Sequence, residues 1–392
     1  MRVLGVTAEY NPIHNGHIYH LTESRVMSKA DFIVAVMSGD FTQRGEPAVY
    51  DKWVRSKMAV ESGVDLVIEL PFIYATGSAE GFAAGAVDIF NGLGCVTDIS
   101  FGSESGQAGE LYQLAGFLTD EPDEFKKVLK EKLKEGLAYP AARQAAVAEV
   151  IGPAAAGLLS QPNNILGVEY IKALRRTGSK IGAHTVRRQG LYGDTSMDVR
   201  FPSAAAIREK LYAGDREGIA DAVPALPDER PAVPEDMWPA LQLKILQTGP
   251  EELSEIYGVG EGIENRLKKE IRMYGSLEGY ARAVKSKRYT RTGINRMLLH
   301  ILMGLTKRDI EKSRKAGTYA RILAAGPEGR RLLRIVRDNE MNSIPLLTNI
   351  NRSEYSSRSL DLDILASDMY NRMTGRDMYS RSDMVMKPTI KP

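Results

Sequence analysis

The first half of the chain alternates short apolar runs with segments of helical length, and this alternation restricts the fold more than any other feature. It is the pattern expected of a parallel β-sheet with helices on its faces. We expect strands at residues 3–8, 32–38, 66–70, 99–102 and 180–186. We expect helices at residues 17–29, 51–62, 79–93, within 121–151, 164–177 and 203–213. The predicted fold class is therefore α/β, with a Rossmann-like, doubly wound sheet in which ligands bind beyond the carboxyl ends of the strands.

A cluster of prolines marks the end of this first part. Pro224, Pro227, Pro231 and Pro234 follow one another closely, and proline lacks an amide hydrogen and breaks helices. Beyond them we expect helices at residues 237–247, 261–274, 293–305 and 307–325, then a poorly ordered polar tail after residue 371. A chain of 392 residues is long enough for two cores. We therefore predict a Rossmann-like domain at residues 1–222 and a mainly α-helical domain at residues 223–392.

Composition excludes several classes of protein. Hydrophobic residues make up 43% of the chain and charged residues 26%, which is ordinary for a globular protein. The single cysteine, Cys95, excludes an internal disulfide and a multi-cysteine zinc site, and it favours a reducing compartment. The amino terminus lacks the features of a signal peptide, and no apolar run reaches the roughly 20 residues that span a bilayer. We therefore expect a cytoplasmic protein with no membrane partner.

Positive charge is concentrated late in the chain, although the net charge is only +2. Between residues 282 and 315 eleven Lys and Arg face two acidic residues, with a tyrosine interleaved. Phosphate contacts combined with base stacking are what binding of RNA requires. The predicted RNA contacts are Lys285, Lys287, Arg288, Tyr289, Arg291 and Arg296. A solvated helix face is the alternative, but the glycine-containing turn and helix at residues 256–266 also resemble a helix-hairpin-helix turn.

The most informative stretch is GVTAEYNPIHNGHIYHL at residues 5–21. It predicts a strand, a turn through Asn11 and Pro12, and a helix that begins near His14. Unpaired amides and the helix dipole favour phosphate at such a helix start, and imidazoles three residues apart can both reach it. Gly16 lets the backbone approach a ligand closely, so we expect a phosphate site around His14 and His17. The other predicted ligand contacts here are Thr7, Ala8, Glu9, Tyr10, Asn11 and Pro12. The alternatives are scattered histidines, or a zinc site that would lack a third ligand.

Three later segments are candidates for the same pocket. Gly102 ends the predicted fourth strand, where it would admit a nucleotide closely or simply make a turn. Asn163 and Asn164 offer paired amides before a helix, although one of them is equally suited to cap that helix. Arg187 and Arg188 follow the fifth strand, on the ligand side of the sheet. They are candidates for phosphate contact or adenine stacking, or else solvated surface arginines.

HNGH at residues 14–17 resembles the H-x-G-H motif of nucleotidyltransferases, which transfer a nucleotidyl group from a triphosphate. Further segments are similar to one family within that superfamily, the bacterial tRNA(Met) cytidine acetate ligases. They are SGDFTQRGEP at 38–47, VIELP at 67–71, FGSE at 101–104, PNNILG at 162–167, EGIENR at 261–266 and KRYTR at 287–291. The resemblance covers nearly the whole chain.

This resemblance implies that the first domain binds ATP and activates acetate as acetyl-adenylate, with release of pyrophosphate. It also implies that the activated acetyl group is transferred to N4 of the wobble cytidine of elongator tRNA(Met), held by the helical domain. Acetate is already deprotonated at neutral pH, so its attack on the α-phosphate needs no base. The site must instead orient the reactants and stabilise the leaving pyrophosphate, which makes His14 and His17 the expected catalytic residues. Mg²⁺ is expected with ATP, but no metal-ligand set and no protein partner is evident.

The segment SAAAIR at residues 203–208 resembles the second phosphate motif of the superfamily, in which Ser203 and Arg208 are candidate ATP contacts. That motif usually contains more Ser and Thr before the Ile-Arg pair. The alanines Ala204 and Ala205 therefore argue against direct phosphate contact at those two positions. A second departure lies at residues 293–295, GIN, where another bulky or basic residue is expected. Some RNA contacts are therefore expected to differ.

Asp40, Gln43 and Arg44 follow the second predicted strand and are expected at the same edge of the sheet. They are candidates for contact with acetate, metal or the incoming cytidine, or they only hold their loop. Two rival functions stay open at this point. One is a small-molecule nucleotidyltransferase that makes a dinucleotide-type cofactor, and the other is a non-catalytic RNA-binding protein that uses ATP as a ligand.

Overall fold

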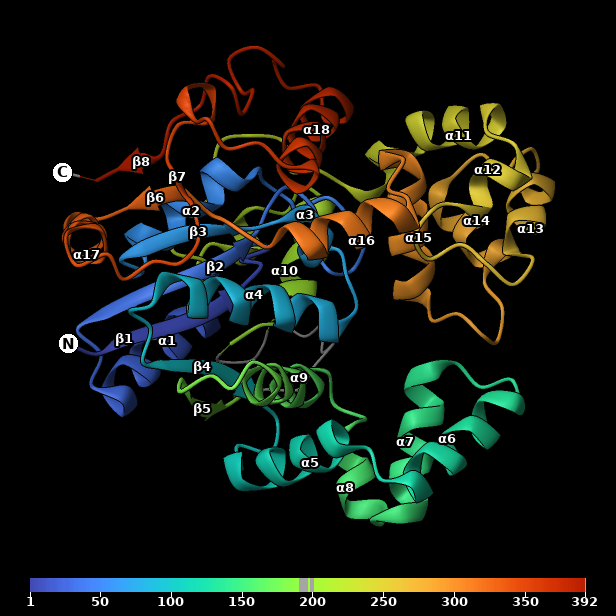
Figure 1. Cartoon of the computed structure of the whole chain (residues 1–392). Helices are drawn as coiled ribbons and strands as arrows, with labels where there is room; N and C mark the ends of the chain where they lie inside the picture. The colour runs from blue at the N-terminus through green and yellow to red at the C-terminus, as the bar shows by residue number, and fades with distance from the viewer. Residues whose placement is uncertain (190–196, 198–200, 392) are drawn as a thin grey trace.

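The computed structural model describes residues 1–189, 197 and 201–391. Its centre is an eight-stranded sheet with the order β5-β4-β1-β2-β3-β6-β7, and β8 also pairs with β6 (Figure 1). The strands are β1 (Val3–Ala8), β2 (Phe32–Ser38), β3 (Leu66–Leu70), β4 (Asp98–Ser103), β5 (Gly182–Arg187), β6 (Ala320–Ala325), β7 (Leu346–Leu347) and β8 (Thr389–Ile390). Strands β1 to β5 are mutually parallel, and β6 runs antiparallel to β3. The predicted α/β class is confirmed.

Helices cover both faces of the sheet and form a separate group beyond its edge (Figure 1). The helices up to residue 212 are α1 (Asn15–Ser28), α2 (Lys52–Glu61), α3 (Phe72–Ala75), α4 (Ala79–Leu93), α5 (Ala108–Asp120), α6 (Asp123–Lys134), α7 (Tyr139–Val150), α8 (Pro153–Leu158), α9 (Pro162–Arg176) and α10 (Ala204–Tyr212). The later ones are α11 (Trp238–Gln247), α12 (Pro250–Ser254), α13 (Ile263–Glu270), α14 (Leu277–Val284), α15 (Arg291–Met303), α16 (Lys307–Ala316), α17 (Pro327–Asp338) and α18 (Arg358–Met373).

The strands are continuous apolar runs because both faces of the sheet are buried. Successive side chains of a strand point to opposite faces, so neighbours belong to different cores. Val34 and Val36 of β2 pack in the core that includes α4 and α9, whereas Ile33 and Ala35 pack in the core with α1 and α2. The sheet thus separates α1 from α4 and α9.

Strand β1 lies between β2 and β4, so the order of connections reverses beside it. The chain first moves outward through β2 and β3, then returns to the other side of β1 for β4 and β5. Ligands of doubly wound sheets bind at this reversal, outside the carboxyl ends of the strands. The segments that follow β1, β2, β4 and β5 meet there, which agrees with the predicted location of the site.

The predicted helix at residues 307–325 is wrong over its second half. Helix α16 ends at Gly317, whose φ of 81° suits glycine, and the chain continues as β6. The apolar sequence of β6, ARILAA, suits a helix or a buried strand, and only its pairing with β3 decides. Because β6 to β8 join the first sheet, residues 320–391 do not belong to a separate helical unit. The helices α11 to α15 alone make up the predicted mainly helical part.

The predicted disorder after residue 371 is also wrong for the described residues. Asp383 is buried there, and its carboxylate bonds Lys52 at 2.7 Å and Arg321 at 2.6 Å. Glu69 pairs with the same two cations, so the two positive and two negative charges balance inside the protein and the polar tail is held to the sheet. Elsewhere the long helix expected within residues 121–151 is two helices, α6 and α7, and α5 precedes them unpredicted.

Candidate active site

The H-x-G-H segment folds as the start of α1. His14 is the residue before the first helical turn, and its Nδ1 accepts a hydrogen from the backbone of Gly16 at 3.1 Å. The Nδ1 of His17 in turn accepts the backbone hydrogen of His14 at 3.2 Å. The two imidazoles therefore cap the helix reciprocally, as Ser and Glu do in an ordinary capping box. Their ring centres lie 3.9 Å apart.

This capping determines the protonation of both rings. Because each Nδ1 accepts a hydrogen, the proton of each neutral imidazole lies on Nε2. Burial, with a smaller contribution from Arg188, lowers the pKa of His14 to about 3. Burial and the neighbouring His14 lower the pKa of His17 well below its ordinary value. Both rings are consequently neutral near pH 7 and present N–H donors.

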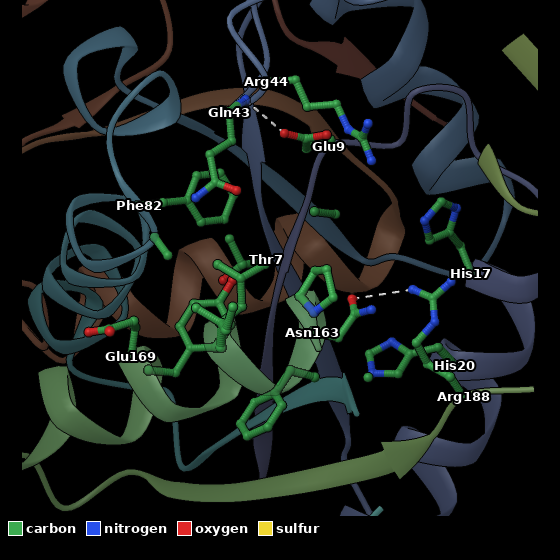
Figure 2. A pocket seen from close by; sticks show the side chains of 18 of the residues that line it. Thr7, Glu9, His17, His20, Gln43, Arg44, Phe82, Asn163, Glu169 and Arg188 are labelled. Carbon is green, nitrogen blue, oxygen red and sulfur yellow. Dashed lines mark hydrogen bonds between the residues drawn. The ribbon is translucent and has the colours of Figure 1, made fainter. Parts of the chain in front are cut away.

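A cavity of about 790 Å³ opens over the carboxyl edge of the sheet (Figure 2). Most residues predicted from the sequence to bind ATP or substrate line it, together with one residue predicted to bind RNA. They are Thr7, Ala8, Glu9, Tyr10, His14, Gly16, His17, Gln43, Arg44, Gly102, Asn163, Arg187, Arg188 and Arg296. Segments separated by nearly 300 positions therefore converge on a single cavity.

Asn163 and Arg188 are joined by a direct hydrogen bond, and Asn163 is held in turn by Glu104, which was not singled out as a site residue. Glu104 accepts hydrogens from the side chain of Asn163 at 2.6 Å and from the backbone of Asn164 at 3.0 Å. It thereby caps α9, where a carboxylate also suits the helix dipole. The guanidinium of Arg188 donates to the amide oxygen of Asn163 at 3.2 Å (Figure 2). This series of hydrogen bonds positions Arg188 at the cavity wall.

The other predicted ligand residues do not line the cavity but support it. The side chain of Asn11 accepts the backbone hydrogen of Val49 at 2.8 Å, and the carbonyl of Asn11 accepts from Arg208 at 2.9 Å. The amide oxygen of Asn164 accepts from Ser103 at 2.6 Å. Pro12, Asp40 and Ser203 are likewise outside the lining; Asp40 accepts from the backbone of Lys52, and Ser203 caps α10.

The loop between β2 and α2 is docked on α15 of the helical group. Gly45 has a φ of 74°, and a Cβ there would lie 2.3 Å from the backbone nitrogen of Arg296, so only glycine fits. Glu46 accepts from the side chain of Asn295 at 2.9 Å, and Arg296 donates to the carbonyl of Gln43 at 3.1 Å. Arg296 therefore reaches the cavity from the helical group, although the sequence placed it among the RNA contacts.

The other predicted RNA contacts lie on the surface of α14, α15 and their connection. Lys285, Lys287 and Arg288 are exposed. Arg288 pairs with Glu261 at 2.9 Å and Arg291 with Glu278 at 2.5 Å, so acids from outside the basic run reduce its net charge. The hydroxyl of Tyr289 donates to the carbonyl of Gly260 at 3.0 Å. This bond joins the basic run to the glycine turn between α12 and α13.

The far side of the cavity is built from residues that the sequence did not single out. Figure 2 shows Phe82 and Glu169 there, across Thr7 from His17 and Arg188. The lining on that side comes from α4, α7 and α9 and includes Phe82, Tyr139, Arg143, Glu169 and Tyr170. These residues lie in ordinary helical sequence without a motif, so only the packing of three helices could identify them.

The described part of the chain offers neither a cluster of metal ligands nor a helix that could span a membrane. In these parts of the chain no three His, Cys, Asp or Glu residues are grouped so that they could hold a metal ion. None of the helices at residues 1–189 and 201–391 combines the length and apolar character needed to cross a membrane.

Known proteins match nearly the whole chain in sequence. The model of the family described as HIGH Nucleotidyl Transferase matches residues 1–384. The tRNA(Met) cytidine acetate ligase of Acetivibrio thermocellus is 40% identical and aligns over 94% of each chain. The ligase of the same name from Alkaliphilus metalliredigens is 38% identical over 98% of this chain and 97% of its own.

Solved structures agree with these sequence relatives. The crystal structure of Thermotoga maritima TmcAL without ligand has a TM-score of 0.93 to this chain, with 36% identity and complete coverage of both. The structure of Thermotoga maritima TmcAL bound with alpha-thio ATP has a TM-score of 0.90 and 35% identity, again with complete coverage. The chain belongs to the tRNA(Met) cytidine acetate ligase family, among the HIGH nucleotidyl transferases.

Proposed function

We propose that this protein is a tRNA-modifying ligase that uses ATP and acetate to acetylate N4 of the wobble cytidine of elongator tRNA(Met). The observation that supports this most strongly is the pair of neutral imidazoles, His14 and His17, at a helix start inside the large cavity. Membership of the ligase family and the bound alpha-thio ATP of a relative support ATP as the substrate held there.

In the first step an oxygen of acetate attacks the α-phosphorus of ATP. The bond from that phosphorus to the bridging oxygen breaks, and pyrophosphate leaves with the bond's electron pair. The Nε2–H groups of His14 and His17 donate hydrogen bonds to the phosphates while negative charge grows on the leaving group. Preorganised donors of this kind stabilise a transition state without reorganisation. Arg188 and Arg296, which also line the cavity, add positive charge around the triphosphate.

In the second step the N4 amine of the cytidine attacks the carbonyl carbon of acetyl-adenylate. The bond from that carbon to the phosphate oxygen breaks, AMP leaves, and N4 loses a proton to water. The connection between α14 and α15 and the start of α15 bind the RNA backbone through Lys285, Lys287, Arg288 and Arg291, since phosphate contacts position a nucleic acid. The same helical group contacts the loop between β2 and α2 at Gly45, beside the cavity, so RNA and nucleotide are held close together.

Mg²⁺ is proposed to enter as the complex with ATP. This ion is usually bound through substrate phosphates and waters with only one or two carboxylates. Glu9 fits that requirement, because it lines the cavity and, among the described residues, hydrogen bonds engage only its Oε1, which accepts from the backbone of Gln43. When bound, the ion would neutralise charge on the phosphates.

Acetate-dependent exchange between pyrophosphate and ATP tests the first step, and nucleoside analysis of tRNA incubated with labelled acetate tests the second. We expect both activities from one preparation. A cofactor-forming nucleotidyltransferase would exchange only with another substrate, and a non-catalytic RNA-binding protein would not exchange. Absence of exchange in a folded, ATP-binding preparation would therefore overturn the proposal.

A further inference from the structure

The part of the cavity away from His14 and His17 is lined by helices that pack on the opposite face of the sheet from α1. It is lined by Phe82 of α4, Tyr139 and Arg143 of α7, and Glu169 and Tyr170 of α9, and we call it the acceptor lobe. Helix α1, with His14 and His17, packs on the other face. The lobe and the phosphate site therefore meet over the end of β1, as Figure 2 shows around Thr7.

The polar part of the lobe is a buried ion pair. Arg143 and Glu169 are only 8% and 2% exposed, and one guanidinium nitrogen donates to Oε1 of Glu169. Oε2 of Glu169 accepts from Lys172 at 2.8 Å. A carboxylate oxygen has two lone pairs, so each oxygen of Glu169 can still accept a further hydrogen. Among the described residues, Glu169 is the only hydrogen-bond acceptor that Arg143 reaches, and the Nε of Arg143 has no hydrogen-bond partner.

The apolar part of the lobe is aromatic. Phe82 and Tyr170 are 3% and 4% exposed, whereas Tyr139 is 48% exposed. The guanidinium carbon of Arg143 lies 6.0 Å from the centre of the Tyr139 ring. A flat group that entered the lobe would consequently meet ring faces together with an adjacent donor and acceptor. Enzymes that modify a nucleobase hold it in such a pocket, stacked on aromatic rings and bonded through its pairing edge.

We propose that the acceptor lobe binds the cytosine base of the RNA substrate. Glu169 accepts a hydrogen from the N4 amine, and Arg143 donates to N3 and O2 of the same edge. This assignment rests on the proposed function, and it adds the residues that recognise the acetyl acceptor. Carboxylates are suited to accept from N4 of cytosine. The amine is thereby held at the end of β1, where acetyl-adenylate is formed.

The same arrangement discriminates cytosine from other molecules that could enter the lobe. Uracil carries a carbonyl oxygen where cytosine has its amine, so it would place an acceptor against the carboxylate of Glu169. Acetate has no hydrogen to donate at neutral pH and would meet the same carboxylate. Adenine has an amine and one ring acceptor, but it lacks the second acceptor that Arg143 would bond in cytosine.

The test uses the full-length enzyme with an unmodified elongator tRNA(Met) transcript. In Glu169→Gln and Arg143→Met we expect acetate-dependent pyrophosphate exchange to stay within about twofold of the parent. We expect kcat/KM for tRNA acetylation to fall roughly 10- to 100-fold, the scale of losing one bidentate base contact. Tyr139→Ala should likewise lower tRNA acetylation and leave pyrophosphate exchange unchanged. Because the side chain of Tyr139 is half exposed, this variant remains informative if either buried substitution fails to fold.

A second readout separates recognition from support of the fold. A transcript with uridine at the wobble position should compete with the natural transcript at least about tenfold less well in the parent, and this preference should shrink in Glu169→Gln. Arg175→Met is the matched control, because Arg175 lies on the same helix outside the lining and is exposed. It should change none of these values.

Three outcomes would overturn the assignment. Exchange and acetylation that fall together in folded variants would place the lobe in the adenylation step. Unchanged acetylation in Tyr139→Ala and in the folded buried variants would show that the base is held elsewhere, as would an unchanged preference in Glu169→Gln. Absence of acetate-dependent exchange in the parent enzyme would instead refute the proposed function on which this assignment rests.

Discussion

The Nδ1 atom of His17 lies 3.2 Å from the backbone nitrogen of His14 and accepts its hydrogen. Because His14 accepts from Gly16 in the same way, neither ring is free to rotate or to exchange its two nitrogens. The Nε2–H groups are therefore directed by the backbone of the helix itself. An active site gains from donors held this way, since they need not reorganise when charge develops on a phosphate.

The first prediction concerns these two rings. His14→Ala or His17→Ala should lower acetate-dependent pyrophosphate exchange by roughly 10²-fold or more, the usual loss when one preorganised donor is removed. The measurement is the exchange rate at saturating ATP and acetate. His184→Ala is the matched control, because that ring pairs with Asp98 outside the cavity lining. Near-normal exchange in both active-site variants would refute their catalytic role.

The second prediction concerns Gly16. A Cβ at this position would lie 2.8 Å from the ring of His14, so Gly16→Ala should displace the imidazole and lower exchange. Gly109 of α5 has open space around its Cβ position, and Gly109→Ala should keep full exchange and leave stability equal or higher by up to about 1 kcal/mol. The measurements are the exchange rates and thermal melts of the two variants. Equal exchange in both would show that the His14 ring tolerates the methyl group at position 16.

The third prediction is a loss of stability in acid. Burial lowers the pKa of His300 to about 4, below the ordinary 6.5 that it regains on unfolding. Below pH 6.5 the unfolded chain therefore binds a proton that the folded protein does not, and stability falls as the pH drops from about 6.5 to 4. The loss approaches about 1.4 kcal/mol per pH unit for each such histidine.

Thermal melts between pH 7 and 4.5 measure this dependence. His300→Asn should be less stable at pH 7, because the ring packs against Phe72 and Tyr257, but its stability should depend less steeply on pH. An equally steep dependence in the variant would show that His300 does not titrate in this way.

The fourth prediction separates Arg296 from the RNA contacts near it in sequence. Arg296→Met removes a cation that lines the cavity, so exchange should fall roughly tenfold or more, the scale of one bond to a charged group. Arg282→Met, an exposed position on α14, should leave exchange unchanged. Normal exchange combined with reduced tRNA binding in Arg296→Met would return this residue to the RNA surface.

The fifth prediction concerns salt. Replacement of Lys285, Lys287, Arg288 and Arg291 by Gln should preserve acetate-dependent exchange while tRNA acetylation is lost at moderate salt. Each true phosphate contact that is removed should reduce the slope of log affinity against log salt by about 0.7–0.9. The two lysines should contribute most, because Arg288 and Arg291 already pair with Glu261 and Glu278. If exchange falls in parallel, these side chains support the fold or the ATP site instead.

The local sequence pattern was enough to predict much of the first sheet and its helices. The bounds predicted for β1, β2 and β3 are those observed, and β4 and β5 differ by one or two residues. Both faces of these strands are buried, so each strand is a short apolar run. Such a run can be recognised from its local sequence alone. The H-x-G-H site was equally predictable, because strand, turn, glycine and helix start lie within some fifteen consecutive residues.

Only the tertiary structure decided what depends on residues far apart in the chain. β6 was predicted to be helix because its apolar sequence suits both states, and its backbone hydrogen bonds to β3 come from some 250 positions away. Arg296 was assigned to RNA because it follows a basic run, yet the docking of Gly45 on its backbone turns it into the cavity. Arg143 and Glu169 have no motif at all. The sequence alone could therefore point to the proposed phosphate site, whose geometry is local, whereas the proposed acceptor lobe exists only where three helices pack together.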